Sequence, residues 1–475
     1  MKYVLGIDLG TSYFKVIIVD EIGRGVGFAR IRTPKTTNGK LVTMSAAVFL
    51  QAIKSSIAEA VEKANIDSHD IVGISYGSQS NTFLLLDRHG QPLTDFYIWS
   101  TEFDATVDPS LVELWQQPGF LEETGIGGWC TPGSTINKLL WMKNNRKDMW
   151  GKIAKVATLP DYLMLFLTGT LYADESSDSL LGLLSVKQQK WLPASLDAIG
   201  MRAEQFGTVV RGGEFVGHLT DKAAAFLHLK ADTKVFSGGL DHIVASIGAG
   251  LGYHAPLSES TGTVIAAVAI RDDYSPRRNV ALSPFPQTDA YAYLSFYGMG
   301  SETVERYKEA YFPDESIDDM LSRSATIPVG SNGVNYYDYE DSDLPLEKRF
   351  TNTTGNKDDE IRAILEGICY RTYLMCESAT GVTQLDSILS TGGLNRSVDL
   401  LQLRANLLGS NVITCVQKEL GAYGAAILAA VGCSWYNHFN EAQKAWIEIE
   451  HVYHPDKDTH AAYLDWIASR KKRYR

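Results

Sequence analysis

The sequence has 475 residues, a length typical of two or three domains rather than one. Hydrophobic residues make up 45% and charged residues 21%, which is the composition of a globular protein and excludes a fibrous or disordered chain. The formal net charge of −12 argues against nucleic acid as a partner, because a surface with that balance repels phosphate backbones.

Strand and helix patterns alternate at the beginning of the chain. β-Branched and apolar runs predict strands over residues 3–7, 14–19, 26–31 and 71–75, with a turn at 9–12 that makes the first two strands a hairpin. Ile53, Ile57 and Val61 recur every four residues, which predicts an amphipathic helix over 45–64. This layering is typical of an α/β domain with a mixed sheet and helices on its faces.

A similar order begins again after residue 250. A turn at 260–263 leads into a strand at 264–270, and later segments predict a helix at 360–379, a strand at 387–390 and a helix at 400–408. The two halves therefore look like related α/β domains, joined near the small residues 248–252. We expect domains at 1–248 and 249–434, followed by a helical tail at 435–475.

The sequence also predicts where the protein resides. No apolar run reaches the roughly 18 residues that a membrane-spanning helix needs, and no secretory signal is evident. Five cysteines lack CxxC spacing and Cys/His clustering, which indicates reduced structural thiols: Cys130, Cys369, Cys376, Cys415 and Cys433. We expect a cytoplasmic enzyme with no membrane partner.

The turn of the first hairpin carries the first chemical motif. Asp8-Leu9-Gly10-Thr11-Ser12 joins a carboxylate to a glycine turn and two hydroxyls. The backbone N–H groups of such a turn can bind an anion, and the Asp can hold Mg²⁺ through waters. Alone, the motif is equally an ordinary Asp-x-Gly turn.

Three further loops raise the specificity. Ser260–Thr263 repeats the phosphate-binding chemistry in the second half, and Thr391-Gly392-Gly393 offers a flat platform for a base. Residues 237–242 end a strand, open a helix and contain Asp241. No P-loop, HExxH, EF-hand or GxSxG motif competes with them. Together they predict a nucleotide held between two domains.

These motifs, in this order, resemble the FGGY family of carbohydrate kinases within the actin-like ATPase superfamily. The matching segments span more than 400 residues: GIDLGTSYFK at the start, KLLWMK at 138–143, IAKVATLPDYLMLFLTG at 153–169, GGLDH at 238–242, and the closing STGGLNRSVDLLQLRANLLGSNV and ELGAYGAAILAAVG. The resemblance implies two actin-like (ribonuclease H-like) domains, each a mixed β-sheet flanked by helices, with the active-site cleft between them.

The resemblance also implies a role for each matched position. It makes Asp241 the catalytic base and sets Asp8 and Asp241 beside Mg²⁺. The terminal phosphates of ATP would meet Gly10, Thr11, Ser12 and Lys15. The opposite side of the phosphate chain would meet Thr261, Gly262 and Thr263, and the adenosine would be flanked by Gly392, Gly393 and Asn395. The physics agrees, because phosphoryl transfer depends mainly on positioning, charge neutralisation and one carboxylate that accepts the attacking hydroxyl's proton.

Two of these residues have plainer alternatives. Lys15 could be a solvent-facing strand residue, given its alternation with Tyr13 and Ile17. Asp241 could be a helix N-cap. We favour catalysis for Asp241, because a carboxylate at a strand end points into the crevice where α/β proteins bind ligands. His242 is expected to be a packing residue rather than a base.

The sugar pocket departs from the family. The segment 77–82 carries Ser80-Asn81, where xylulokinases have Met-His and glycerol kinases Arg-Glu. Trp99 is kept, but Thr101 and Phe103 replace an Asp and an Arg, and the Arg-Thr-Pro loop is altered at 336–354. The expected substrate-binding residues are Gln79, Ser80, Asn81, Trp99 and Asp241.

The leading hypothesis is ATP- and Mg²⁺-dependent phosphorylation of a small sugar or polyol, pentulose-like in size. Two alternatives stay open: an actin-like ATPase module that uses hydrolysis to drive conformational change or assembly, and a sugar-sensing pseudokinase. Gln79, Asn81 and Trp99 favour the kinase, because they suit hydroxyl groups against an apolar wall. A homodimer is left open.

Overall fold

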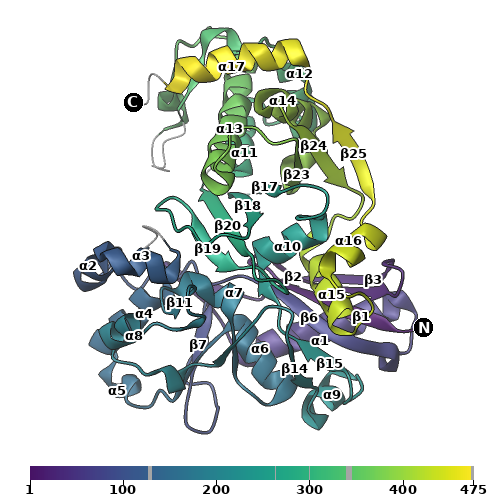
Figure 1. Cartoon of the computed structure of the whole chain (residues 1–475). Coiled ribbons are helices and arrows are strands. Elements are labelled where there is room, and N and C mark those ends of the chain that lie inside the picture. Colours follow the sequence, from purple (N-terminus) through teal and green to yellow (C-terminus); the bar gives the residue numbers. More distant parts are fainter. Residues whose placement is uncertain (127–130, 263, 299, 338–344, 472–475) are drawn as a thin grey trace. The chain divides into compact units, whose positions relative to one another are not determined.

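The computed structural model describes residues 1–126, 131–262, 264–298, 300–337 and 345–471 (Figure 1). They form two compact units, each assembled from separate stretches of the chain. Unit 1 contains residues 1–250, 271–292 and 417–447, and unit 2 contains residues 251–270, 293–416 and 448–475. The expected domains were continuous in sequence, whereas these units exchange segments after residue 250.

Unit 1 is built on a mixed sheet in the order β14-β15-β6-β1-β2-β3, with β16 also paired to β6. Its strands are β1 (Tyr3–Leu9), β2 (Tyr13–Asp20), β3 (Gly25–Arg32), β6 (Ile71–Ser78), β14 (Phe215–His218), β15 (Lys234–Phe236) and β16 (Gly239–Leu240). The β1–β2 hairpin is antiparallel, and β6 runs parallel to β1. The predicted hairpin, third strand and mixed sheet are confirmed.

A smaller sheet in unit 1 has the order β4-β5-β8-β7-β9. Its strands are β4 (Thr36–Asn38), β5 (Leu41–Met44), β7 (Phe83–Leu86), β8 (Phe96–Tyr97) and β9 (Lys155–Thr158). Two short strand pairs join β10 (Tyr172–Asp174) to β13 (Thr208–Val210) and β11 (Leu184–Ser185) to β12 (Lys190–Trp191), and β19 (Ala281–Pro284) also belongs to this unit. The loop between β6 and β7 carries the expected sugar residues Gln79, Ser80 and Asn81, and Trp99 follows β8.

The helices of unit 1 are α1 (Ala46–Ala64), α2 (Pro109–Gln116), α3 (Pro118–Thr124), α4 (Thr135–Asn145), α5 (Lys147–Trp150), α6 (Leu159–Thr168), α7 (Glu175–Asp178), α8 (Pro193–Ile199), α9 (Asp221–Leu227), α10 (Asp241–Ala249), α15 (Leu420–Gly432) and α16 (Phe439–Trp446). Helix α1 begins where predicted, because the Ser45 side chain accepts the N–H of Val48. Its buried face contains Phe49, Ile53 and Ile57, which join the core of the sheet. Helix α15, yellow in Figure 1, packs on the purple β1 although it comes from the other end of the chain.

Unit 2 repeats the hairpin-and-parallel-strand arrangement. Its strands run in the order β20-β18-β17-β23-β24-β25. They are β17 (Leu257–Thr261), β18 (Ile265–Arg271), β20 (Tyr291–Tyr297), β23 (Ser387–Thr391), β24 (Asn411–Cys415) and β25 (Ile449–Tyr453), with a separate pair β21 (Asn335–Tyr336) and β22 (Phe350–Thr351). Its helices are α11 (Ser301–Tyr311), α12 (Ile317–Ala325), α13 (Lys357–Thr380), α14 (Val398–Leu408) and α17 (Lys457–Lys471). The expected strands at 264–270 and 387–390 and helices at 360–379 and 400–408 are confirmed.

The prediction of a wholly helical C-terminal tail is wrong. Residues 449–453 form β25, which pairs antiparallel with β24. This strand has weak local periodicity, so the long-range hydrogen bonds to β24 decide its conformation. The tail is also divided, since α16 belongs to unit 1 whereas β25 and α17 belong to unit 2.

Two general expectations can be checked on the described residues. Among their helices, none combines the length and hydrophobicity that crossing a membrane requires. The four described cysteines form no disulfide: Cys369, Cys376, Cys415 and Cys433. Burial raises the pKa of both Cys369 and Cys376 to about 12, which makes them poor nucleophiles. Cys130 lies outside the described residues.

Candidate active site

The two predicted acidic residues stand on either side of the end of β6. Asp8 of β1 pairs with Gly77 of β6, and on the opposite side Leu240 of β16 pairs with Ser78. Asp241 follows directly as the first residue of α10. The negative charge of Asp241 acts on the Asp8 carboxyl strongly enough to help raise its pKa. The topology therefore brings both carboxylates to one sheet edge.

Asp241 is not the N-cap of its helix. Leu240 occupies the cap position, and the Asp241 carboxylate accepts the N–H of His242 at 2.7 Å. The side chain is only partly buried and lies at the positive end of the α10 dipole, where an ionised carboxylate is stabilised. It is thus accessible enough for a small ligand to reach.

Asp8 is 8% exposed and has one close cationic partner, Lys15. Burial raises the pKa of Asp8 to about 6, and the Lys15 ammonium, 3.5 Å away, opposes that rise. Lys15 sits directly opposite Asp8 in the hairpin register, so it is not the solvent-facing strand residue of the alternative interpretation. Although burial lowers the pKa of Lys15, the carboxylates of Asp8 and Glu419 raise it above its ordinary value.

Glu419 was not among the predicted site residues. Its carboxylate lies 3.0 Å from the Lys15 ammonium, at the start of α15. Gly421, two residues later, leaves room for the Asp8 side chain, because a Cβ at this position would stand 2.8 Å from the Asp8 carboxyl carbon. An acid directly before a glycine-rich helix start was the only sequence signal for this position.

Several hydrogen bonds hold the loop at residues 9–12 in place, whereas Ser12 is exposed. The Thr33 hydroxyl donates to the Gly10 carbonyl at 2.9 Å. The Thr11 hydroxyl receives the indole N–H of Trp99 at 2.8 Å and donates to Gln79 Oε1 at 3.4 Å. The phosphate loop and the expected sugar residues are therefore parts of one hydrogen-bonded cluster within unit 1.

Three expected sugar-binding side chains are bonded to the protein itself. The Gln79 amide donates to the Leu9 carbonyl at 3.3 Å, and the Ser80 hydroxyl donates to the Ser177 carbonyl at 2.6 Å. The Asn81 carbonyl oxygen accepts from the N–H and hydroxyl of Thr135 at 2.8 and 2.9 Å. These side chains shape the segment, whereas Trp99, 43% exposed, presents its ring outward.

The two substituted positions after Trp99 are also committed to packing. The Thr101 hydroxyl is fully buried and donates to the Val42 carbonyl at 2.6 Å. Phe103 stacks on Trp141, with ring centroids 4.7 Å apart. At positions 101 and 103, where the family pattern has an Asp and an Arg, this chain therefore has no charged side chain.

In unit 2, the loop after β17 rests on a buried ion pair. Arg404 of α14 and Glu259 of β17 are both fully buried, with Nη1 and Oε2 2.9 Å apart. The Thr261 hydroxyl is bound to both, receiving Arg404 Nη2 at 2.8 Å and donating to Glu259. Ser390 donates to Glu259 Oε2 at 2.7 Å. Thr261 can thus offer a ligand its backbone but not its hydroxyl.

The expected adenosine residues lie beside this network. Gly392 has φ +98° and ψ 177°, a conformation essentially restricted to glycine, and a Cβ there would stand 2.6 Å from the Thr261 carbonyl oxygen. Asn395 accepts from Arg404 Nη1 at 3.1 Å through Oδ1. Its Nδ2 is buried without a hydrogen-bond partner among the described residues, a donor that suits a purine base. Gly262 turns the β17–β18 hairpin, and Thr263 lies outside the described residues, as do residues 338–344 of the altered loop.

The acidic groups fit magnesium better than a permanently bound metal. Among the described residues, no group of three or more His, Cys, Asp or Glu side chains could hold a metal ion. Mg²⁺ needs only one or two carboxylates, because waters and substrate phosphates complete its octahedron. Asp8 and Asp241 match that requirement.

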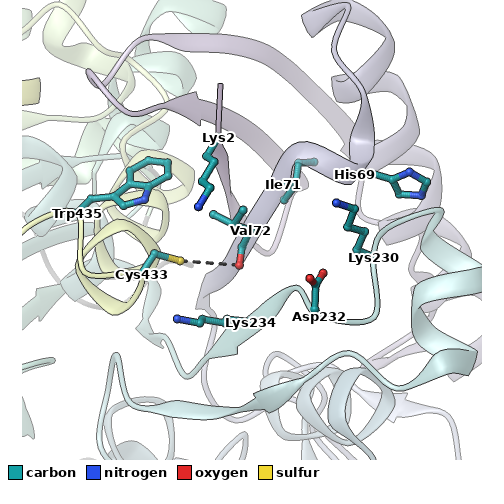
Figure 2. A pocket seen from close by; sticks show the side chains of 9 residues that line it. All are labelled: Lys2, His69, Ile71, Val72, Lys230, Asp232, Lys234, Cys433 and Trp435. Carbon is teal, nitrogen blue, oxygen red and sulfur yellow. Dashed lines mark hydrogen bonds between the residues drawn. The ribbon is translucent and has the colours of Figure 1, made fainter.

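Unit 1 also has a cavity of about 310 Å³ away from these residues (Figure 2). It lies where β6 and β15 begin, at the opposite end of the strands from Ser78. Its lining residues are Lys2, His69, Ile71, Val72, Lys230, Asp232, Lys234, Cys433 and Trp435. No predicted site residue is among them.

Comparison with known proteins agrees with this geometry. The N-terminal domain model of the FGGY family of carbohydrate kinases matches residues 3–248, and the C-terminal domain model matches residues 344–433. A xylulose kinase of Bacillus subtilis is 28% identical, with 96% of this chain and 93% of that protein aligned.

Solved structures share the fold. The xylulose kinase from Rhodospirillum rubrum has a TM-score of 0.89 at 20% identity, covering 100% of this chain and 98% of that one. The ligand-bound xylulose kinase from Lactobacillus acidophilus has a TM-score of 0.87 at 23% identity, covering 98% and 96%. The chain therefore belongs to the FGGY family of carbohydrate kinases, and it is an ATP-dependent sugar kinase with a two-domain α/β, actin-like fold.

Proposed function

We propose that this kinase transfers the γ-phosphate of ATP to a hydroxyl of a small, uncharged, pentulose-like sugar, with Asp241 as the general base. The observation that carries the proposal is the pair of carboxylates on either side of the end of β6, one buried beside Lys15 and one partly open at a helix start. Two carboxylates in such different surroundings can divide the work, one holding a cation and the other accepting a proton.

Asp241 is assigned the proton because its carboxylate is the more accessible of the two. It accepts the proton of the attacking sugar hydroxyl as the phosphoryl group is transferred. Asp8 would hold Mg²⁺, and its pKa of about 6 keeps most of the carboxyl ionised at neutral pH. When bound, Mg²⁺ neutralises charge on the phosphates.

The remaining assignments follow the same logic. Lys15, Gly10, Thr11 and Ser12 bind the terminal phosphates, through one ammonium and the backbone N–H groups of the turn. In unit 2, the backbone of Thr261 and Gly262 serves the phosphate chain, together with Thr263. Gly392, Gly393 and Asn395 hold the adenosine, with the unpaired Nδ2 of Asn395 as donor.

The acceptor is inferred from what surrounds Trp99. The exposed indole face provides an apolar wall for a sugar ring or chain, and Asp241 provides the polar contact. Because Gln79, Ser80 and Asn81 use their polar atoms within the protein, they fix the pocket's shape. Thr101 and Phe103 leave no charge for an acidic substrate. We therefore expect a neutral acceptor that differs from both D-xylulose and glycerol.

A single kinetic experiment tests the assignment. Wild-type enzyme is screened for ADP release with ATP, Mg²⁺ and a panel of ketoses, aldoses, sugar acids and polyols, and the best acceptor is then used with Asp241→Asn. Turnover should fall by roughly 10² to 10⁴, the usual contribution of a general base, while the KM for ATP and the melting temperature change little.

A matched control separates catalysis from helix stability. Asp221 is also the first residue of its helix, α9, so Asp221→Asn removes a carboxylate from the same helical position. That variant should keep wild-type turnover. If Asp241→Asn retains most sugar-dependent ADP release, another group is the base. If D-xylulose has the highest specificity constant, the inference about the acceptor is wrong.

The same screen distinguishes the alternatives. An ATPase module would release ADP at a rate that no sugar increases. A sugar-sensing pseudokinase would show sugar-dependent thermal stabilisation with the same low ADP release in wild type and in Asp241→Asn.

A further inference from the structure

The most unusual charged group outside the phosphate loop is Lys138 of α4. Its side chain is fully buried, and its ammonium donates to three backbone carbonyls: Asn81 at 3.2 Å, Ile98 at 3.2 Å and Trp99 at 3.1 Å. No carboxylate within the described residues forms an ion pair with it. Burial lowers the pKa of Lys138 to about 7, with only the more distant Glu102 opposing.

The three carbonyls belong to two separate loops. Asn81 lies between β6 and β7, whereas Ile98 and Trp99 follow β8. A further direct link between the loops is the Thr82 hydroxyl, which accepts the N–H of Trp99 at 3.0 Å. One ammonium therefore joins the segment that carries Gln79–Asn81 to the segment that carries the exposed indole.

Helix α4 holds the first loop at a second point. Thr135, one turn before Lys138, donates its N–H and its hydroxyl to the Asn81 side chain. Residues three apart share a helix face, so the start of α4 presents these groups together. Asn81 itself has φ +58°, a conformation that Asn tolerates better than most residues. The loop is thus fixed by its backbone and by its side chain.

We propose that Lys138 is a positioning residue for the acceptor sugar, setting the separation between the Asn81 loop and Trp99. This inference rests on the proposed function, because it takes these two segments as the walls of the sugar pocket. A lysine suits the task since its three donors match the three carbonyls, of which that of Ile98 also accepts the N–H of Thr101 at 2.8 Å. Lys138 touches neither substrate, so its effect should appear in sugar binding more than in the chemical step.

The test compares Lys138→Met, which keeps length but removes all donors, with Lys138→Gln, which keeps two donors without charge. For Lys138→Met we expect the KM for the best acceptor to rise at least about tenfold, since misplacement by 1 Å can cost about 10²-fold. The KM for ATP should change less than the sugar KM, because Lys138 reaches the phosphate loop only indirectly, through Trp99 and the bond from its indole to Thr11. Lys138→Gln should recover part of the loss.

Hydrogen exchange provides a readout that does not depend on turnover. In Lys138→Met, amides of residues 79–82 and 98–101 should exchange faster, while those of β1 and β2 should not change. The control is Lys143→Met on the same helix, where the lysine donates to the Ala198 carbonyl at 3.3 Å, away from both loops. It should leave sugar KM and loop exchange at wild-type values.

Each outcome of these measurements either supports the proposed role of Lys138 or overturns it. An unchanged sugar KM in folded Lys138→Met overturns the proposal, and so does unfolding of both variants, which would make Lys138 a core stability residue. If the wild type and Lys143→Met show no sugar-dependent ADP release, the proposed function fails instead. In that case faster exchange in the two loops would still report the link that Lys138 makes.

Discussion

The two predicted phosphate loops occupy equivalent places in similar hairpins but differ in their electrostatics. In unit 1, Asp8 is enclosed beside Lys15, whose side chain is 28% exposed and is shared with Glu419. In unit 2, Glu259 and Arg404 are both 0% exposed, and the two charges pair with each other and bind the Thr261 hydroxyl. The charged groups of the first loop are partly exposed and can bind other partners. Those of the second loop are buried and bind only each other and their neighbours.

This difference suggests a division of labour. A raised carboxyl pKa beside an accessible ammonium is typical of a site that handles ions and protons. A buried ion pair that also bonds its neighbours instead fixes one backbone geometry, because breaking it is costly. We expect substitutions in the first loop to alter catalysis and substitutions in the second to alter stability and nucleotide affinity.

The largest effect should come from opening the buried ion pair of unit 2. Arg404→Met leaves the Glu259 carboxylate buried without its cation, which should lower the free energy of unfolding by about 3–5 kcal/mol. Urea denaturation measures this loss. The exposed Arg396→Met is the control, and Glu259→Leu combined with Arg404→Met should lose less than the sum of the single variants. Additive losses would contradict the coupling.

The next effect concerns the backbone platform beside that pair. Gly392→Ala places a Cβ 2.6 Å from the Thr261 carbonyl oxygen in a glycine-only conformation, so it should cost about 1–3 kcal/mol and raise the KM for ATP. Gly393→Ala is a matched control for stability, because its Cβ would have nothing within 4 Å. Equal melting temperatures for the two variants would show that the strain is relieved elsewhere.

A smaller effect is expected at the first loop, on ion binding rather than folding. Asp8→Asn replaces a carboxylate with a neutral amide, so the apparent affinity for Mg²⁺ should fall roughly 10- to 100-fold, as for other groups that act on a metal through its waters. Activity measured against Mg²⁺ concentration tests this. An unchanged magnesium dependence with reduced turnover would place Asp8 in another role.

The last effect depends on pH and lies outside both loops. Burial raises the pKa of Asp178, which is completely buried near Asp161 and Asp174, well above its ordinary value. A raised folded-state pKa means that stability is full below about pH 4 and falls as the pH rises toward the folded-state pKa. Asp178→Asn should therefore gain stability relative to wild type by up to about 1.4 kcal/mol for each pH unit between about pH 4 and the folded-state pKa, and no further gain should appear above that pKa.

Thermal melts between pH 5 and 9 follow this difference. The gain of Asp178→Asn over wild type should grow with pH, whereas the exposed Asp197→Asn should show no such trend. A gain that stays constant with pH would mean that Asp178 is not held protonated by the fold.

Much of the fold could be predicted because its signals are local. The strand over residues 3–7, the hairpin turn and the helix over 45–64 follow from alternation, glycine placement and a Ser45 cap. Strand β25 could not be predicted, since its pairing with β24 supplies hydrogen bonds that no local pattern encodes. For the same reason the exchange of segments between the units is invisible in the order of elements.

By itself, the sequence was enough to recognise the family and to single out Asp8 and Asp241, because both residues lie in short motifs that can be read without knowing the fold. Only the tertiary structure decided how those residues are tuned. Glu419 forms an ion pair with Lys15 because α15 packs on β1. Lys138 donates hydrogen bonds to two loops because α4 packs against both of them. Burial and charge contacts between distant segments set pKa values and loop positions, and such contacts exist only once the chain is folded.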